Sequence, residues 1–444
     1  MPGPSLRLGG LVALLASGSA VGQDAPLALH ERFTPGAAYR VTLESKLTGR
    51  LAVPQPDKKT PDVLPFVGQS TLDYDERPLA PTDDGTARVV RNYRKVEFAR
   101  TIGDRPQTAE VRAAVRRMVV LRGAKGKKVP FSPDGPLTLG EIEVVRIDVF
   151  SPVLVTGLLP ANPVKPGDKW PAADAAVVEL TDYDAVESNA LTVEFVAVVN
   201  LNGRRLAKLA LAGAVAGSTE DGPSRQAITG TAYFDLDDQR LSYLKINGKS
   251  QLLGPKGVTA GEVAGTFTLT RAKADAPAGL TPDDLKAVDL LPTAANSLLL
   301  YDDPSTGVRF DYPRRWRVGV TAGRQLAIDE ATGQAGLLLT TTPPDKTPTA
   351  AAYLVEVKGF GIKQGWTVTG ETAPARAAGD PAVDRFTLDV TSKGEKLRLP
   401  YAVVTTPAGG ATVAARVVAG PQAAVLEADI DGIVRSLRLA KPVE

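Results

Sequence analysis

The chain carries few side chains that could perform catalysis near neutral pH. It has no Cys and a single His, His30, which excludes disulfides, Cys-ligated zinc, iron–sulfur clusters, thiol nucleophiles and a lipidated Cys. A Ser-His-Asp triad needs a rigidly held imidazole, and His30 lies a few residues after the expected signal cleavage site, where chains are usually frayed. We interpret His30 as an incidental, solvated residue.

Carboxylates are the remaining catalytic candidates. They recur in pairs, at Asp73 and Asp75, Asp182 and Asp184, and Asp302 and Asp303. A glycosidase needs two carboxyls held several ångström apart across a cleft, a relation that sequence spacing does not show. Aromatic residues make up only 5% of the chain, which is sparse for a sugar-binding groove. We prefer surface solvation; a carboxylate-based hydrolase would need two facing acids, at least one with a raised pKa.

No motif identifies a metal, nucleotide or organic cofactor. Gly248-Lys249-Ser250 resembles the end of a phosphate-binding loop, but Tyr243 stands where that motif needs its first Gly. Asp235, Asp237 and Asp238 could offer oxygen ligands to Ca²⁺. Asp also favours turns through bonds to nearby backbone N–H groups, and we prefer that interpretation.

A run of basic residues is the best candidate for binding. It comprises Arg112, Arg116, Arg117, Arg122, Lys125, Lys127 and Lys128, and no acid lies among these residues after Glu110. The last four basic residues, Arg122, Lys125, Lys127 and Lys128, form a candidate anion-binding patch. In an exported protein this patch could meet anionic lipid headgroups or an acidic wall polymer. The alternative is a solvated loop around Gly123 and Gly126.

Composition limits the elements that can position these groups. A chain of 444 residues suits two or three domains, and 43% hydrophobic residues suffice for real cores. With 42 Gly and 35 Pro, turns are frequent, which favours short strands over long helices. Lys and Arg number 52 against 50 Asp and Glu, a balance that argues against a nucleic-acid binder.

The first 22 residues are typical of a secretory signal peptide. Arg7 supplies the positive charge, residues 8–16 the apolar stretch, and small residues follow. The stretch is shorter than the ~20 residues that a membrane span needs, and no later stretch spans either. We therefore expect an exported, soluble protein, periplasmic or extracellular.

A first domain, residues 24–271, is predicted to be an antiparallel sheet. From Val41 to Val53, apolar and polar residues alternate with period two, which indicates a strand with one buried face. Thr138 and Glu141 have the spacing of a capping box, and apolar residues follow at helical spacing. Ser151-Pro152 indicates a second helix start. We expect a large curved antiparallel sheet with a helical lid.

A linker with a short helix, residues 272–297, and a second domain, residues 298–444, follow. Thr281-Pro282 begins the short helix, with acids in its first turn. In the second domain, strands alternate with helices. Leu426, Ile430, Ile433 and Leu437 form one apolar stripe on the last helix, which should pack across a sheet. The chain is thus predicted to be α+β and β-rich.

The second domain resembles the PsbP/DcrB-like family of αβα sandwiches. The resemblance rests on residues 307–316, GVRFDYPRRW, and on Ile433-Val-Arg-Ser-Leu437 near the end. It implies a non-catalytic exported accessory or assembly factor without a family active site. The first domain resembles the open half-barrels of the LolA/LppX type in architecture alone.

These observations leave three hypotheses. The leading one is an exported, non-catalytic binding or assembly protein that serves an envelope protein or an apolar or anionic ligand. The second is a carrier of a lipid or other apolar ligand in the first domain, which predicts an apolar cavity under the helices of residues 142–159. The third is the carboxylate-based hydrolase.

Overall fold

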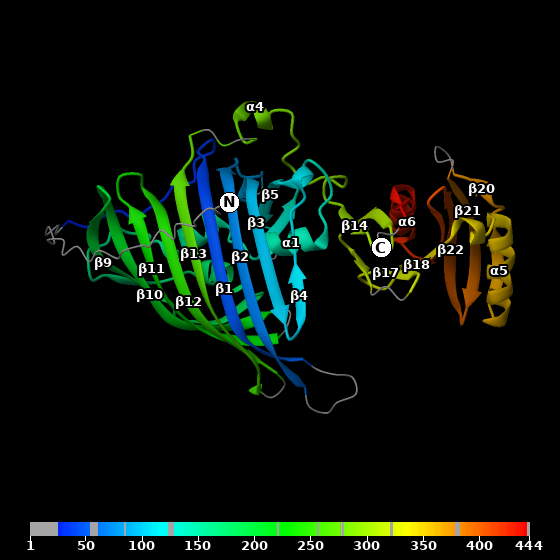
Figure 1. Ribbon diagram of the computed structural model, residues 1–444, viewed down its shortest axis with the longest axis horizontal. Helices are drawn as coiled ribbons and strands as arrows, with labels where there is room; N and C mark the ends of the chain where they lie inside the picture. Colours follow the sequence, from blue (N-terminus) through cyan, green and yellow to red (C-terminus); the bar gives the residue numbers. More distant parts are fainter. Residues whose placement is uncertain are drawn as a thin grey trace, which may run out of the picture.

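The computed structural model describes residues 25–441, apart from 54–60, 84–85, 123–127, 220–221, 255–256, 276, 278, 320–322 and 378–381. The expected signal peptide lies outside the described residues. The fold is β-rich, as predicted, with sheets of 13, three and eight strands (Figure 1). Among the described helices, none has the length and apolar character needed to cross a bilayer.

The large sheet of the first domain is antiparallel and open. Its path runs β6 (Lys128–Phe131), β5 (Arg117–Arg122), β3 (Arg88–Ile102), β2 (Asp62–Pro78), β1 (Tyr39–Val53), β13 (Thr259–Lys273), β12 (Arg240–Leu253), β11 (Gly222–Asp235), β10 (Arg204–Thr219), β9 (Thr192–Leu201) and β7 (Lys169–Pro171). Two strands lie off this path: β4 (Arg105–Thr108) pairs with β3, and β8 (Ala185–Asn189) pairs with β10.

Alternation along β1 sets the inner face of this sheet, as predicted. Val41 and Leu43 are fully buried, whereas Glu44 between the inner positions is exposed. Glycines on the same face let the strands approach closely where the sheet bends. A Cβ on Gly49 would lie 2.1 Å from the carbonyl oxygen of Glu262, so only Gly fits there.

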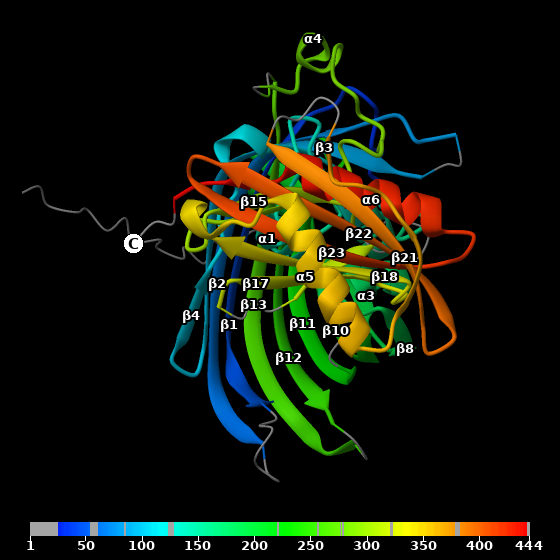
Figure 2. The ribbon, with the colours of Figure 1, turned by 90° about the vertical axis from the view of Figure 1, so that its right-hand side faces the viewer.

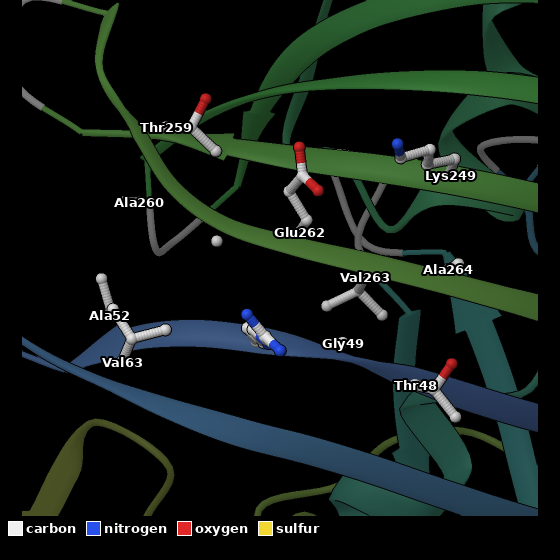
Figure 3. A pocket seen from close by; sticks show the side chains of 12 residues that line it. Thr48, Gly49, Ala52, Val63, Lys249, Thr259, Ala260, Glu262, Val263 and Ala264 are labelled. Carbon is white, nitrogen blue, oxygen red and sulfur yellow. The ribbon is translucent and has the colours of Figure 1, made fainter.

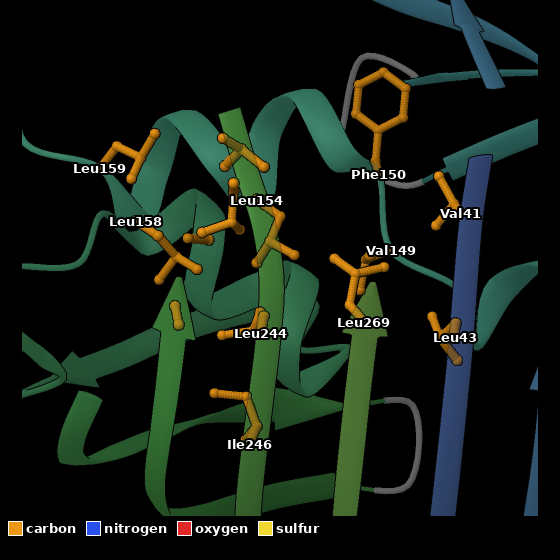
Figure 4. Packing of buried hydrophobic residues seen from close by; sticks show 14 of the residues in the cluster. Val41, Leu43, Val149, Phe150, Leu154, Leu158, Leu159, Leu244, Ile246 and Leu269 are labelled. Carbon is orange, nitrogen blue, oxygen red and sulfur yellow. The ribbon is translucent and has the colours of Figure 1, made fainter. Parts of the chain in front are cut away.

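Three short helices lie on the inner face: α1 (Leu139–Arg146), α2 (Ser151–Leu158) and α3 (Asp174–Thr181). We call residues 139–181 the helical cover. The predicted capping box is confirmed, because Thr138 Oγ1 accepts from the Glu141 N–H at 3.2 Å and the Glu141 carboxylate accepts from the Thr138 N–H at 2.8 Å. Figure 4 shows Leu154 and Leu158 of α2 packed over Leu244 on the strands, within one buried cluster.

The second domain holds two further sheets. One comprises β14 (Leu299–Asp303), β15 (Val308–Tyr312) and β24 (Arg438–Leu439). The other comprises β16 (Trp316–Val318), β17 (Gln325–Glu330), β18 (Ala335–Thr342), β23 (Gly409–Val418), β22 (Glu395–Thr406), β21 (Val383–Ser392) and β19 (Thr367–Glu371), with β20 (Ala375–Arg376) beside β21.

Two helices cover opposite faces of the eight-stranded sheet. The face of β22 that carries Tyr401 packs under α5 (Ala350–Lys363), and the face that carries Ala402 belongs to the core under α6 (Ala423–Ser436). Figure 2 shows α5 in front of this sheet, with the large sheet curving below. The predicted stripe on the last helix is confirmed, since Leu426, Ile430 and Ile433 are buried.

The segment between the domains is docked on the outer face of the large sheet. It contains α4 (Pro282–Leu285), and Leu280 is buried against Val90, Val119 and Phe131. Leu300 N donates to Leu137 O at 2.8 Å, so the two domains meet beside α1. Short 3-10 turns at Ala113–Val115 and Pro344–Lys346 complete the described elements.

Candidate ligand-binding site

The inner face of the large sheet is covered at one end and open at the other. Leu72 and Tyr74 of β2 are fully buried beneath the helical cover, whereas Phe66 of the same strand is only half-buried. The half-buried apolar residues of this open end are Leu47, Leu51, Leu64, Phe66, Phe98, Ile102, Leu252, Val263 and Phe267. We call this set the open floor.

Strand register brings the residues of the open floor together. Gly49 lies between Phe66 on β2 and Val263 on β13, and Ile102 on β3 lies opposite Phe66. The side chain of Leu47 occupies the space next to Gly68, because it lies 3.5 Å from the position that a Cβ on Gly68 would take. The floor crosses from β3 to β12, about 20 Å at the usual spacing of strands.

The cation Arg100 on β3 lies within the rows of the open floor. The register places it opposite Gly68, in the row of Leu47. Its Nε donates to Gln107 Oε1 at 2.7 Å, and its guanidinium lies 5.8 Å from the centroid of the Phe98 ring. The side chain is half-buried.

A hollow of about 490 Å³ lies between β1 and β13 at this end of the sheet (Figure 3). Its lining combines outer-face side chains, such as Arg50 and Glu262, with Val263 of the open floor. Small residues, including Ala52, Ala260 and Ala264, make up much of the rest. Most of the side chains that line this hollow therefore belong to the outer face of the sheet, opposite the open floor.

A second hollow of about 450 Å³ lies between the helical cover and the second domain. Its charged lining residues are Arg122, Lys128, Arg146, Asp174, Glu179, Asp182, Asp184, Arg314 and Arg317. Both signs are present in similar number. Arg314 donates to the carbonyl oxygens of Ser297 and Pro130, which ties the second domain to β6.

Two members of the predicted anion-binding patch line this interdomain hollow, and both are bound within the chain. Arg122 Nη2 donates to Glu179 Oε1 at 2.9 Å. Lys128 Nζ donates to Arg146 O at 2.9 Å and lies 3.7 Å from Glu179 Oε2. Lys125 and Lys127 lie outside the described residues, so the patch stays a prediction.

The acid pairs noted in the sequence separate into different roles. Asp75 is buried and ion-paired with Arg40. Asp182 and Asp184 both line the interdomain hollow. Desolvation raises the pKa of Asp182, although its side chain is 67% exposed and Arg146 lies 3.9 Å away. The nearby cations Lys128 and Arg146 oppose this rise in the pKa of Asp182.

The structure shows the surroundings of His30 and of the cluster Asp235, Asp237 and Asp238. His30 is exposed, but it is not frayed as we expected, because Leu29 and Glu31 on either side are buried and Leu27 pairs with Val164. The Asp cluster is a plain turn, as predicted: Asp235 Oδ1 accepts from the Asp237 and Asp238 N–H groups at 3.0 Å. Within the described part of the chain, no cluster of three or more acids or His could hold a metal.

A buried ionic network under the helical cover escaped the sequence analysis. Arg91 donates to Glu76 at 2.9 Å and to Asp148 at 2.8 Å, and all three side chains are fully buried. Tyr74 Oη donates to Asp148 at 3.0 Å. Burial raises the pKa of Asp148, and Arg91 opposes that shift. The only signal was that Arg91 falls at an inner position of β3, opposite Glu76.

Comparison with known proteins gives no family. No protein-family model matches the sequence, and no curated protein matches it. Cyanobacterial PsbP from Synechocystis sp. PCC 6803 matches with 15% identity over 34% of this chain and 95% of its own, at a TM-score of 0.25. The Ran-binding protein Mog1p of Saccharomyces cerevisiae matches with 8% identity over 32% and 96%, also at 0.25.

A third solved structure covers more of the chain. DynF from the dynemicin biosynthesis pathway of Micromonospora chersina matches with 10% identity over 60% of this chain and 92% of its own, at a TM-score of 0.15. TM-scores of this size carry no argument about fold or function.

Proposed function

We propose that this chain is an exported, non-catalytic binding protein whose open floor holds an apolar ligand. The observation that supports this most is the set of apolar residues of the open floor, which are only half-buried, whereas Leu72 and Tyr74 at the other end of the same inner face are fully buried. Contiguous apolar surface on a folded protein commonly marks a site for a ligand or partner.

The location differs from the one first expected for a carrier. The space under residues 142–159 is filled, because Leu154, Leu158 and Leu244 are at most 2% exposed and pack together (Figure 4). A ligand bound there would have to displace a close-packed core. The open floor needs no such displacement, so the carrier hypothesis moves to the uncovered end.

The second domain fits the role of a PsbP/DcrB-like sandwich that engages an envelope partner. Support comes from α5 and α6 on opposite faces of its sheet. The aromatic-Pro-x-x-Trp turn buries Trp316, whose Nε1 donates to Asp429 of α6 at 2.7 Å. This contact ties the first turn of the domain to its last helix, as expected of a rigid accessory module.

A pair of adjacent residues on β2 tests the proposal. Phe66 belongs to the open floor, whereas Val67 faces outward and is 54% exposed. We expect the neutral fluorescent probe N-phenylnaphthylamine to bind the mature protein saturably. Phe66→Glu should weaken that binding by about tenfold or more, because it places a charge on the apolar floor.

Val67→Glu is the matched control and should bind like the unmodified protein. Circular dichroism of each variant checks the fold, and Leu51→Gln gives a milder second variant of the floor. The proposal is wrong if the unmodified protein does not bind the probe, or if Phe66→Glu and Val67→Glu bind it equally.

A further inference from the structure

Arg100 is unusual among the inner-face residues of the open end. Among the described inner positions of β1, β2, β3, β12 and β13 between the row of Ser45 and the row of Leu51, the others are apolar, Gly or Ser. Arg105 on β4 lies opposite Ile102 on the same face and is exposed. Two cations thus stand at the β3–β4 wall of an otherwise uncharged floor.

Arg100 has no acidic partner in the described part of the chain. It contacts the neutral Gln107 amide and the Phe98 ring, and it forms no ion pair with any described residue. A guanidinium half-removed from water gains most from an oppositely charged group. Its planar fork matches a carboxylate or a phosphate with two parallel hydrogen bonds.

We infer that the ligand of the open floor is an amphiphile with an anionic head, bound at Arg100, and a long apolar tail. This inference rests on the proposed function and names its ligand class. The tail would cross from β3 over Leu47 and Val263 toward β12, a path of about 20 Å. A free fatty acid and an anionic phospholipid share this chemistry.

Palmitate and palmityl alcohol test the inference, because they share a tail and differ only in the charge of the head. We expect the mature protein to bind palmitate about tenfold more tightly than the alcohol. Arg100→Gln should abolish that preference while keeping the affinity for the alcohol. Arg100→Lys, which keeps the charge but loses the fork, should give an intermediate preference.

Arg50→Gln is the control, since Arg50 lies on the outer face of β1 opposite Glu262 and is exposed. It should keep the full preference for palmitate. Competition between palmitate and dipalmitoyl phosphatidate then separates the two sources: stronger displacement by phosphatidate assigns a phospholipid, and weaker displacement assigns a free fatty acid.

One result would overturn the anionic head of the ligand, and another would overturn the proposed function itself. If palmitate and the alcohol bind equally, with or without Arg100, the anionic head is wrong and the apolar site stands. If neither compound binds, and N-phenylnaphthylamine also fails to bind, the proposed function itself fails.

Discussion

Two arginines on the inner face of β3 behave differently at the two ends of one sheet. Arg91 lies under the helical cover, fully buried, and is paired with Glu76 and Asp148. Arg100 lies on the open floor, half-buried, and its polar and ring contacts among the described residues are with the neutral groups of Gln107 and Phe98. The same residue type on the same face thus serves as the centre of an ionic network at one end and as a cation without a described carboxylate partner at the other.

The difference comes from what lies over each end. At the covered end, the chain supplies Asp148 between α1 and α2, so the counter-charge arrives with the helices. At the open end, no described carboxylate takes that place, and apolar residues such as Leu47 stay half-buried. The alternation along a strand determines which of its side chains face inward. Which residues those side chains contact depends on a segment distant in the sequence.

Removal of Arg91 should produce the largest effect on stability. Arg91→Ala leaves Glu76 and Asp148 buried without their cation, which typically costs about 3–5 kcal/mol of unfolding free energy. Arg100→Gln should cost less than about 1 kcal/mol, because Arg100 holds no buried charge in place. Urea unfolding of both variants measures the difference.

Lys95→Ala is the control for Arg91→Ala, since Lys95 pairs with Glu97 on the exposed face of the same strand. Exposed pairs contribute only about 0–1 kcal/mol. Equal destabilisation by Arg91→Ala and Arg100→Gln would break the contrast between the two ends.

Truncation of apolar side chains should also lower the unfolding free energy more at the covered end than on the open floor, with smaller effects than those of the arginine variants. Leu154→Ala removes a fully buried side chain between α2 and the sheet, which should cost about 2–5 kcal/mol. Leu51→Ala on the open floor should cost about 1 kcal/mol or less, because half-buried side chains lose less on truncation. In thermal unfolding, palmitate should raise the melting temperature of the unmodified protein more than that of the Leu51→Ala variant. An equal rise in both proteins would contradict the proposed site.

Local patterns predicted the parts of the fold that neighbouring residues determine. Alternation predicted the inner face of β1, the spacing of Thr138 and Glu141 predicted the start of α1, and the stripe around Ile430 predicted α6. Helix α3 was missed, because its N-cap residue Ala173 makes no side-chain cap and its eight residues show only a short pattern.

Long-range pairings explain what the sequence analysis could not predict. Arg122 belonged to a run of cations without nearby acids, yet its partner Glu179 comes from α3, 57 residues later in the chain. The extent of the open floor could not be predicted either. The inner residues of β1 alternate with outer ones in the same way where helices cover them and where they do not. The register between the strands, and how far the helical cover extends along the sheet, are known only from the structure.

The attachment of the helical cover has a pH dependence that tests its cause. Glu141 accepts from the Arg112 Nε at 2.8 Å, from the Arg112 Nη2 at 2.7 Å and from the Thr138 N–H at 2.8 Å. Burial alone would raise the pKa of Glu141, but these hydrogen bonds outweigh it and lower the pKa below its ordinary value of 4.5.

Glu141→Gln should therefore lower the unfolding free energy by about 1–3 kcal/mol at neutral pH. Because the folded pKa is lowered, the stabilisation is complete above the unfolded pKa and is lost as pH falls through the folded pKa. The gap between Glu141→Gln and the unmodified protein should then narrow progressively below pH 4.5, as urea unfolding at several pH values would measure. Glu143→Gln, exposed on the same helix, should show no such gap at any pH. A gap for Glu141→Gln that is the same at acid and neutral pH would mean that packing, and not the charge-assisted contact with Arg112, holds the cover at this end.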